Sequence, residues 1–98
     1  MSEKRPCAYI LASGRNGTLY VGATTNLVNR VEAHRAGAVP GFTRKYKVGM
    51  LVYAESHDTI EHALLREKQI KKWRRAWKLE LIERDNPQWR DLFEEHLL

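Results

Sequence analysis

Cys7-Ala8-Tyr9-Ile10 and Leu19-Tyr20-Val21-Gly22 are two short runs joined through the turn-rich Gly14-Arg15-Asn16-Gly17. Both runs are apolar or β-prone, and the glycines and asparagine between them tolerate a positive φ, so the stretch predicts a β-hairpin. Tyr9 and Tyr20 then lie on its two arms. A single small core rarely needs two polar-tipped aromatic residues in that arrangement, which makes the pair a candidate functional site.

The segment after the hairpin predicts a helix and a third strand. Thr24 or Thr25 can cap a helix over about residues 26–36, and Gly37 is placed to end it. The loop that follows is basic and aromatic, and residues 48–54 contain the third strand.

The second half of the chain predicts two more helices. Asp58, with Glu61 three residues later, resembles a capping box, so a helix is expected to start near Thr59. Apolar residues then recur at helical spacing, and nothing breaks the pattern before Asn86-Pro87. We expect a bend near Trp73 that leads into a third helix. The order β-β-α-β-α-α predicts an α+β fold, a small three-stranded antiparallel sheet flanked by helices.

The length of the chain limits the number of domains, and its net charge indicates the class of binding partner. The 98 residues favour a single domain over 1–98, with its core at about 7–92 and a short tail on either side. Lysine and arginine total 17 against 12 aspartate and glutamate, and the net charge of +5 indicates a polyanion as partner. Seven of the bases fall between Arg66 and Lys78. A solvated helix face followed by an acidic tail is the plainer interpretation of that run.

Cys7 is the single cysteine of the sequence, which excludes an intrachain disulfide and a CxxC-type metal site. No apolar run has the length of a membrane span, and residues 1–6 lack the apolar core of a secretory signal. These features predict an unprocessed cytoplasmic protein.

Glu67 is the acidic residue that stands out. Helical spacing from Ile60 through Ala63 places it near the face that carries Ile70, and a carboxylate on a core-facing stripe is unfavourable unless it is paired or binds a cation. An ion pair with Lys71, or a place at the edge of the stripe where the side chain reaches water, explains it without a metal. Spacing alone favours these two interpretations.

Arg30 and His34 lie four residues apart, so they project from one face of the first helix. Arginine suits a phosphate because its planar fork donates two hydrogen bonds and stays charged. By spacing alone, a solvated face with a histidine near the helix end is favoured. Tyr9 and Tyr20 taken singly are likewise ordinary strand residues. A divalent cation and Arg30 beside them would lower a phenol pKa and make it a base or a water-orienting group.

Aromatic and basic side chains interleave in the loop after the first helix and along the later helices, as expected where bases stack and phosphates pair. The signal is weak by itself, and Trp77 is expected to lie in the core. The candidate nucleic-acid-binding residues are Phe42, Arg44, Lys45, Tyr46, Lys68, Lys71, Lys72, Trp73, Arg74 and Arg75.

In their order along the chain, these residues resemble the GIY-YIG nuclease domain, most closely its small stand-alone bacterial members of the YhbQ-like kind. Cys7-Ala8-Tyr9 stands where that family has Gly-Ile-Tyr, so the tyrosine is retained and the two residues before it differ. Tyr20-Val21-Gly22 stands for Tyr-Ile-Gly. Arg30 falls ten residues after Tyr20, at the place of the family's catalytic arginine, and His34 follows at the family's helical spacing.

Later segments extend the resemblance to about Cys7 through Leu92. Arg66-Glu67-Lys68-Gln69-Ile70-Lys71-Lys72-Trp73 resembles the segment that carries the family's single metal-binding glutamate. Gly41-Phe42-Thr43 resembles a loop of the stand-alone members, and Asn86-Pro87-Gln88-Trp89 resembles a late Asn-Pro element.

The resemblance implies a metal-dependent endonuclease that hydrolyses DNA phosphodiester bonds, with a role in repair or recombination on nicked, branched or single-stranded substrates. Arg30 would neutralise the transition state, a tyrosine would orient or deprotonate the attacking water, and His34 would fix one of these groups. The implied metal is Mg²⁺ or Mn²⁺, held by Glu67. The implied catalytic set is Tyr9, Tyr20, Arg30, His34, Glu67 and Asn86.

Two other functions fit the same composition. One is a nucleic-acid-binding module that keeps the fold without cleavage, and the other is a protein-interaction domain with a basic helical face. Retention of Tyr9, Tyr20, Arg30 and Glu67 together argues against both, because neither function requires that set. A monomer or a weak homodimer is expected.

Overall fold

The computed structural model of this chain describes residues 5–38, 41 and 46–97. The predicted order of strands and helices is confirmed, and a further short helix follows where an acidic tail was expected. The elements in chain order are β1 (Cys7–Ala12), β2 (Leu19–Thr24), α1 (Leu27–Arg35), β3 (Met50–Ser56), α3 (Ile60–Lys72), α4 (Arg75–Asp85) and α5 (Phe93–Leu97).

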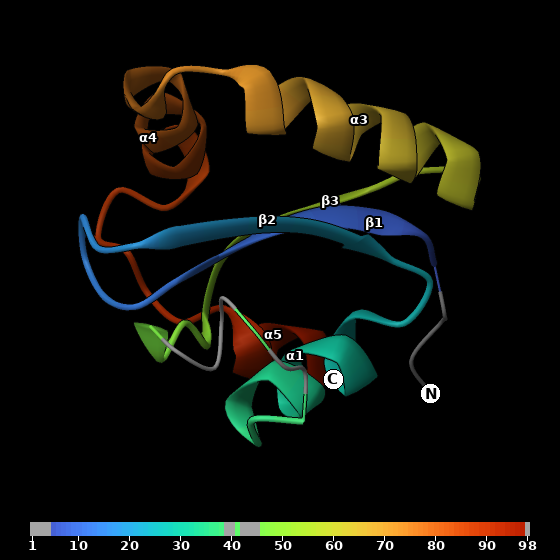
Figure 1. The fold of residues 1–98 in the computed structure, drawn as a ribbon, viewed down its shortest axis with the longest axis horizontal. Coiled ribbons are helices and arrows are strands. Elements are labelled where there is room, and N and C mark those ends of the chain that lie inside the picture. The colour runs from blue at the N-terminus through green and yellow to red at the C-terminus, as the bar shows by residue number, and fades with distance from the viewer. Residues whose placement is uncertain (1–4, 39–40, 42–45, 98) are drawn as a thin grey trace.

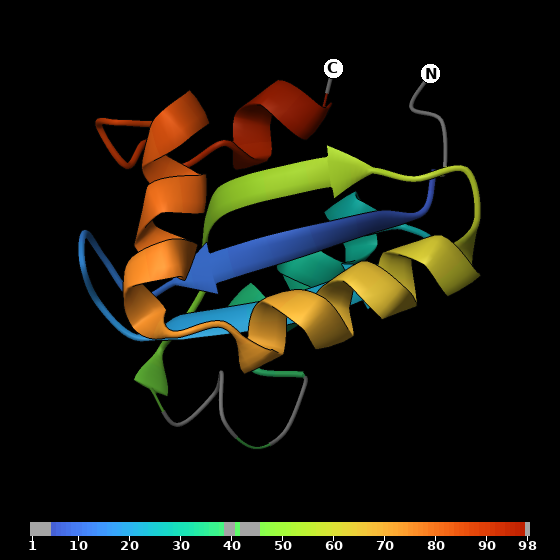
Figure 2. The same cartoon turned by 90° about the horizontal axis from the view of Figure 1, so that it is seen from above.

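A three-stranded antiparallel sheet forms the middle layer. The strand order is β2-β1-β3, so the hairpin is confirmed and β1 is the central strand. Helices cover both faces: α3 and α4 lie on one side, and α1 and α5 lie on the other (Figure 1). Seen from above, α3 lies over β2 and β1, and α4 turns away from the end of α3 (Figure 2). All six residues of β1 are buried as a result.

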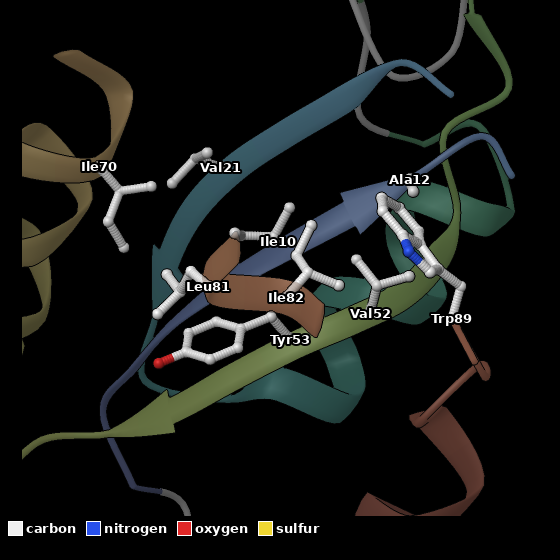
Figure 3. Packing of buried hydrophobic residues seen from close by; sticks show 9 residues of the cluster. All are labelled: Ile10, Ala12, Val21, Val52, Tyr53, Ile70, Leu81, Ile82 and Trp89. Atoms are coloured by element: carbon white, nitrogen blue, oxygen red, sulfur yellow. The ribbon is translucent and has the colours of Figure 1, made fainter. Parts of the chain in front are cut away.

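Two apolar clusters join the layers, one on each face of the sheet. Neighbouring residues of β1 alternate between them, as the period of two in a strand requires. The cluster under α3 and α4 consists of Ile10, Ala12, Val21, Val52, Tyr53, Ile70, Leu81, Ile82 and Trp89 (Figure 3). The cluster toward α1 and α5 consists of Tyr9, Leu11, Val31, Val48, Leu51 and Phe93.

A β-bulge interrupts the pairing of β1 with β3. Ile10 pairs with Tyr53 and Leu11 pairs with Leu51, so Val52 is the extra residue. Val52 and Tyr53 consequently both pack under α3 and α4 (Figure 3), whereas Leu51 packs toward α1 and α5.

The junction between α3 and α4 is tied to the tip of the hairpin. Trp73 and Arg74 adopt extended conformations, which end α3 and confirm the predicted bend. Nη2 of Arg75 then donates to the backbone oxygens of Asn16 and Gly17, each at 2.7 Å. Asn16 has a φ of 56°, in the left-handed region that asparagine tolerates.

Two predictions about α1 and α4 are wrong. Asn26, rather than Thr24 or Thr25, caps α1: its side chain accepts a hydrogen bond from the backbone N–H of Asn29, while Thr24 accepts one from Asn26. Trp77 is 49% exposed instead of buried, because α4 turns Leu81 and Ile82 toward the sheet.

The cap of α3 also differs from the predicted capping box. Thr59, the N-cap, accepts a hydrogen bond from the backbone N–H of His62 at 3.1 Å. Asp58 lies one residue too early for that role, and its side chain is 90% exposed.

Replacing Thr59 with alanine should lower the free energy of unfolding by about 1 kcal/mol, because the N–H of His62 loses its side-chain acceptor. Asp58→Ala is the matched control: its contact is a 3.9 Å ion pair with Arg5, and the change should stay within about 0.5 kcal/mol. Urea denaturation measures both variants. Equal losses would contradict the assignment of Thr59 as the cap.

Candidate functional site

Two tyrosines and a histidine meet on the face of the sheet that α1 covers. The ring centroids of Tyr9 and Tyr20 are 6.3 Å apart, and the His34 ring lies 6.2 Å from Tyr9 and 4.9 Å from Tyr20. The Tyr9 hydroxyl is 3.2 Å from Nε2 of His34. Tyr9 is 1% exposed and His34 4%, whereas Tyr20 is half-buried, so Tyr20 is the ring of the three that reaches solvent.

Gly22 makes room for the Tyr9 ring. The two residues pair across β1 and β2, and a Cβ on Gly22 would lie 2.5 Å from both Cζ and the hydroxyl oxygen of Tyr9. Such a distance is far inside van der Waals contact, so the phenol lies directly against the backbone of β2. Its hydroxyl thereby reaches an edge strand of the sheet although Tyr9 belongs to the central one.

Arg30 joins the tyrosines from α1. Its guanidinium is exposed and hydrogen-bonds both phenols, and the bond to Tyr9 raises the pKa of Arg30. A guanidinium can only donate, so the Tyr9 oxygen accepts from Arg30 and its O–H is left to be donated to Nε2 of His34. Burial raises the pKa of Tyr9 to about 12, although the hydrogen bond from Arg30 acts in the opposite direction.

His34 is held in its neutral form. Burial, and after it the charge of Arg30, lower the pKa of His34 below its usual 6.5. A neutral imidazole has one nitrogen free to accept, which agrees with the donation from Tyr9. Tyr9, Tyr20, Arg30 and His34, all predicted as site residues, therefore form one connected cluster.

Glu67 approaches this cluster from the other layer. It is carried by α3, which packs over β2, and its negative charge contributes to the raised pKa of Tyr9. Its side chain is 16% exposed, and its carboxylate lies 2.9 Å from Nζ of Lys71. The ion pair with Lys71, one of the two interpretations that spacing favoured, is therefore present, and among the described residues Lys71 is the hydrogen-bonding partner of Glu67.

A hydrogen-bonded network fixes the rotation of α3. Glu55 at the end of β3 accepts from Nε of Arg66, at 3.0 and 3.2 Å for its two oxygens, and from the Tyr53 hydroxyl at 2.5 Å. His57 is 2.7 Å from the same carboxylate. Burial pushes the pKa of Glu55 up, but these bonds outweigh it and hold that pKa below its usual value. Arg66 precedes Glu67, so the network sets the direction of Glu67.

Glu55 and Arg66 were not predicted as a pair from the sequence. The available signal was the alternation of Tyr53, Glu55 and His57 at the end of an apolar strand, three hydrogen-bonding groups spaced two apart. Their partner on α3, Arg66, comes eleven residues after Glu55, and the spacing of the sequence does not indicate this contact.

Asn86 lies apart from the tyrosine cluster. It is 1% exposed, its amide donates to the backbone oxygens of Val52 and Arg90, and its carbonyl accepts from the N–H of Arg90. These bonds join the end of α4 to β3, the edge strand on the other side of the sheet from β2. The geometry gives Asn86 a structural part, and its catalytic role stays a prediction.

The predicted nucleic-acid-binding residues occupy different environments. Lys68 and Lys72 are exposed and make no ion pair within the described part of the chain. Lys71 pairs with Glu67, and Arg75 with the hairpin tip. The remaining described members are Tyr46, 46% exposed, together with Trp73 and Arg74, whose contacts involve Trp77. Phe42, Arg44 and Lys45 lie outside the described residues.

The described residues contain no group of three or more histidine, cysteine, aspartate or glutamate side chains that could hold a metal together. Within these residues, a metal near Glu67 would therefore have at most two side chains of these types as ligands. In the same part of the chain, no helix has the length and apolar character needed to cross a bilayer.

The sequence matches the model of the GIY-YIG catalytic domain over residues 5–80. It is similar to a UPF0213 protein of Pediococcus pentosaceus, 36% identical over 77 residues and spanning 79% of this chain and 80% of the relative. A UPF0213 protein of Syntrophus aciditrophicus is 40% identical over 72 residues, 72% of this chain and 82% of the relative.

The fold is also similar to a solved structure. The solution NMR structure of a UPF0213 protein of Bacillus halodurans superposes with a TM-score of 0.55, covers 92% of this chain and 95% of its own, and is 24% identical in sequence. That likeness shows the fold, three antiparallel strands with helices around them.

Gly22→Ala should displace the Tyr9 ring, because the added Cβ would stand 2.5 Å from two of its atoms. We expect a loss of about 1–3 kcal/mol in the free energy of unfolding, the usual effect of overpacking. Gly14→Ala is the control, since a Cβ there meets nothing within 4 Å. If urea denaturation gave the two variants equal stability, the close approach of Tyr9 to β2 would be disproved.

The free energy of unfolding should decrease as the pH is lowered, because His34 is buried in its neutral form. Its folded pKa is lower than its unfolded value, so the unfolded chain binds more protons and the free energy of unfolding decreases as the pH drops below about 6.5. His34→Gln should flatten this decrease below about pH 6.5, measured by denaturation at several pH values. His62→Gln, at an exposed position of α3, serves as the comparison. An unchanged slope in His34→Gln would refute the assignment.

Proposed function

The chain belongs to the GIY-YIG catalytic domain family, and from this premise we propose that it is a divalent-cation-dependent endonuclease that hydrolyses phosphodiester bonds of DNA. The family is one of nucleases, which makes a nucleic acid the expected substrate. One observation carries the proposal: Tyr9, Tyr20, Arg30 and His34, distant in sequence, form a single hydrogen-bonded cluster beside Glu67.

Arg30 is suited to stabilise the transition state. Its guanidinium is exposed while the phenols hold it in place, so it can meet a phosphate without first being ordered. Hydrolysis adds negative charge to the phosphoryl oxygens, and a preorganised donor close to that charge lowers the barrier. Tyr9 and His34 act through Arg30: the chain of donation from Arg30 to Tyr9 to His34 fixes the orientation of the guanidinium.

Tyr20 is the better candidate for contact with the attacking water. Tyr9 is buried, donates its proton to His34 and has a pKa of about 12, so it is a poor base at neutral pH. Tyr20 reaches solvent and shares Arg30 with Tyr9. We therefore assign the orientation of the water to Tyr20 and a positioning role to Tyr9.

Glu67 fits the requirements of Mg²⁺ or Mn²⁺ in this family. Mg²⁺ retains several water ligands and commonly binds through one or two carboxylates and a substrate phosphate, so a single carboxylate is sufficient. The Glu67 carboxylate already attracts a cation, the ammonium of Lys71, which is half exposed and can withdraw into solvent. A bound divalent cation would supply positive charge for the phosphate and the departing oxygen.

The exposed bases of α3 extend the site along the DNA backbone. Lys68 and Lys72 are exposed on the helix that carries Glu67, and the net charge of +5 favours a polyanion. We propose that this surface binds nicked, branched or single-stranded DNA in repair or recombination. A binding module without cleavage remains the rival, because the fold and the charge alone would serve both.

Glu67→Gln should reduce the cleavage rate at least about 100-fold, equivalent to about 2.7 kcal/mol, because the amide replaces the anionic ligand at nearly equal size. The assay uses labelled linear, nicked and branched DNA with Mg²⁺ or Mn²⁺. EDTA should abolish cleavage, and Arg30→Ala should impair it. A labelled RNA in the same assay tells whether the activity extends beyond DNA.

Glu61→Gln is the matched control for that experiment. It makes the same chemical change at an exposed position in the first turn of α3, and cleavage should stay near the wild-type rate. Cleavage that survives both EDTA and Glu67→Gln would sink the mechanism. Salt-sensitive binding without cleavage of any substrate would establish the binding module instead.

A further inference from the structure

A pocket of about 350 Å³ lies at the junction of α3 and α4, on the helical layer that carries Glu67. It is lined by Trp73, Trp77, Glu80, Leu81 and Arg84. Its volume falls at the lower end of the range for small-ligand sites. None of its lining residues belongs to the cluster of tyrosines, arginine and histidine described above.

The two tryptophans form an ordered aromatic platform. Their ring centroids are 6.2 Å apart at an interplanar angle of 80°, an edge-to-face contact. The guanidinium of Arg66 lies 5.0 Å from the Trp73 ring centre, and that of Arg74 lies 5.1 Å from the Trp77 ring centre. These contacts restrain both rings, although Trp77 remains 49% exposed. A solvent-facing aromatic ring that is already ordered loses little entropy when a planar ligand stacks on it.

The charges around the platform indicate which planar ligand fits. Arg74 lies against the Trp77 ring and Arg84 lines the pocket, and neither forms an ion pair within the described residues, so their charges repel a cationic ligand and attract a phosphate-linked one. Glu80 and Arg84, one helical turn apart on α4, both line the pocket, yet within the described residues they form no ion pair with each other or with another side chain. Next to the exposed Trp77 ring, the pocket thus offers a hydrogen-bond acceptor, Glu80, and one helical turn further along α4 a donor, Arg84.

We propose that this pocket binds one unpaired guanine of a DNA strand, with the base stacked on Trp77, its Watson–Crick edge toward Glu80 and an adjacent phosphate toward Arg84. A carboxylate would repel a phosphate, so Glu80 suits a base edge that donates. Guanine presents two parallel donors, N1–H and the N2 amino group, that match the two carboxylate oxygens. Adenine and cytosine place an acceptor beside their amino group, and thymine has a single donor between two carbonyls.

The inference takes DNA as substrate from the proposed function and narrows it to DNA with an unstacked base. Trp73, where the pocket begins, follows Glu67 by six residues, a rise of about 9 Å along α3 at 1.5 Å per residue, which is short enough for one DNA strand to extend from Glu67 to the pocket. A base inside a duplex cannot reach such a pocket, because its edge and faces are already paired and stacked. The pocket therefore selects single-stranded, flapped or bulged DNA.

The test measures binding in EDTA, where the proposed catalysis cannot operate. The probes are a fluorescein-labelled short oligothymidylate with one central guanine, the all-thymine oligonucleotide, and a blunt duplex that contains the same guanine. Anisotropy gives the dissociation constants, and quenching of tryptophan fluorescence reports stacking. The wild-type protein should prefer the guanine-containing single strand over both other probes.

Trp77→Leu should weaken binding of the guanine-containing strand by roughly 5-fold to 100-fold, the usual effect of losing one stacked base. In Glu80→Gln, the ratio of the dissociation constants of the all-thymine strand and the guanine-containing strand should fall to near unity. Both positions are exposed, so the variants keep the fold, and Leu65→Ala removes an exposed apolar residue of α3 outside the pocket as a control that leaves binding unchanged. Unchanged binding by Trp77→Leu, equal binding of all probes, or no binding of the guanine-containing strand would overturn the proposal.

The two proposals fail separately. Metal-dependent cleavage lost in Glu67→Gln, combined with unaltered strand binding by Trp77→Leu, removes the pocket assignment and keeps the nuclease. Guanine-dependent quenching of tryptophan fluorescence without cleavage of any substrate removes the nuclease and keeps the pocket.

Discussion

The contact between the Tyr9 ring and the backbone of Gly22 is the constraint on which the candidate site depends. Because of this contact, the side chain of Tyr9 extends from the central strand β1 across to the edge strand β2. Its buried phenol ring therefore ends with the hydroxyl beside the exposed Arg30. The same burial keeps Tyr9 protonated and His34 neutral, and this leaves Arg30 as the fixed charge of the cluster. A motif of tyrosine and glycine on paired strands is thus a geometric requirement as much as a chemical one.

Much of the fold could be predicted from the sequence, because its signals are local. Turn residues marked the hairpin, and helical periodicity marked α3 and α4, although nothing in that pattern located the bend near Trp73. The errors came from choices between neighbours: Asn26 and Thr59 cap helices where adjacent residues were equally plausible. Trp77 was misplaced because periodicity does not say which of several apolar residues on a short helix meets the sheet.

Tyr9, Tyr20, Arg30 and His34 were predicted together as candidate site residues, but their arrangement was not predictable, and Asn86 from the same predicted set lies elsewhere. Spacing within α1 paired Arg30 with His34, whereas the approach of Glu67 from the opposite layer depends on how α3 packs on β2. Charge counting also overstated the surface available to DNA. Arg66, Lys71 and Arg75 belong to the basic run, yet each is engaged with a carboxylate or a backbone carbonyl of this same chain. Sequence gives the number of charges, and packing decides which of them face outward.

The bulge at Val52 shifts the phase of β3. In an unbroken ladder, side chains two apart share a face, so Leu51, Tyr53 and Glu55 would all point toward α1. With the extra residue, Leu51 packs on the face that α1 and α5 cover, whereas Tyr53 and Glu55 point to the face that α3 and α4 cover. There Glu55 accepts a hydrogen bond from Arg66. The single extra residue in β3, the edge strand on the other side of the sheet from β2, therefore determines how the helix that carries Glu67 is oriented. A single insertion or deletion in β3 would therefore alter the orientation of Glu67 without touching the helix that carries it.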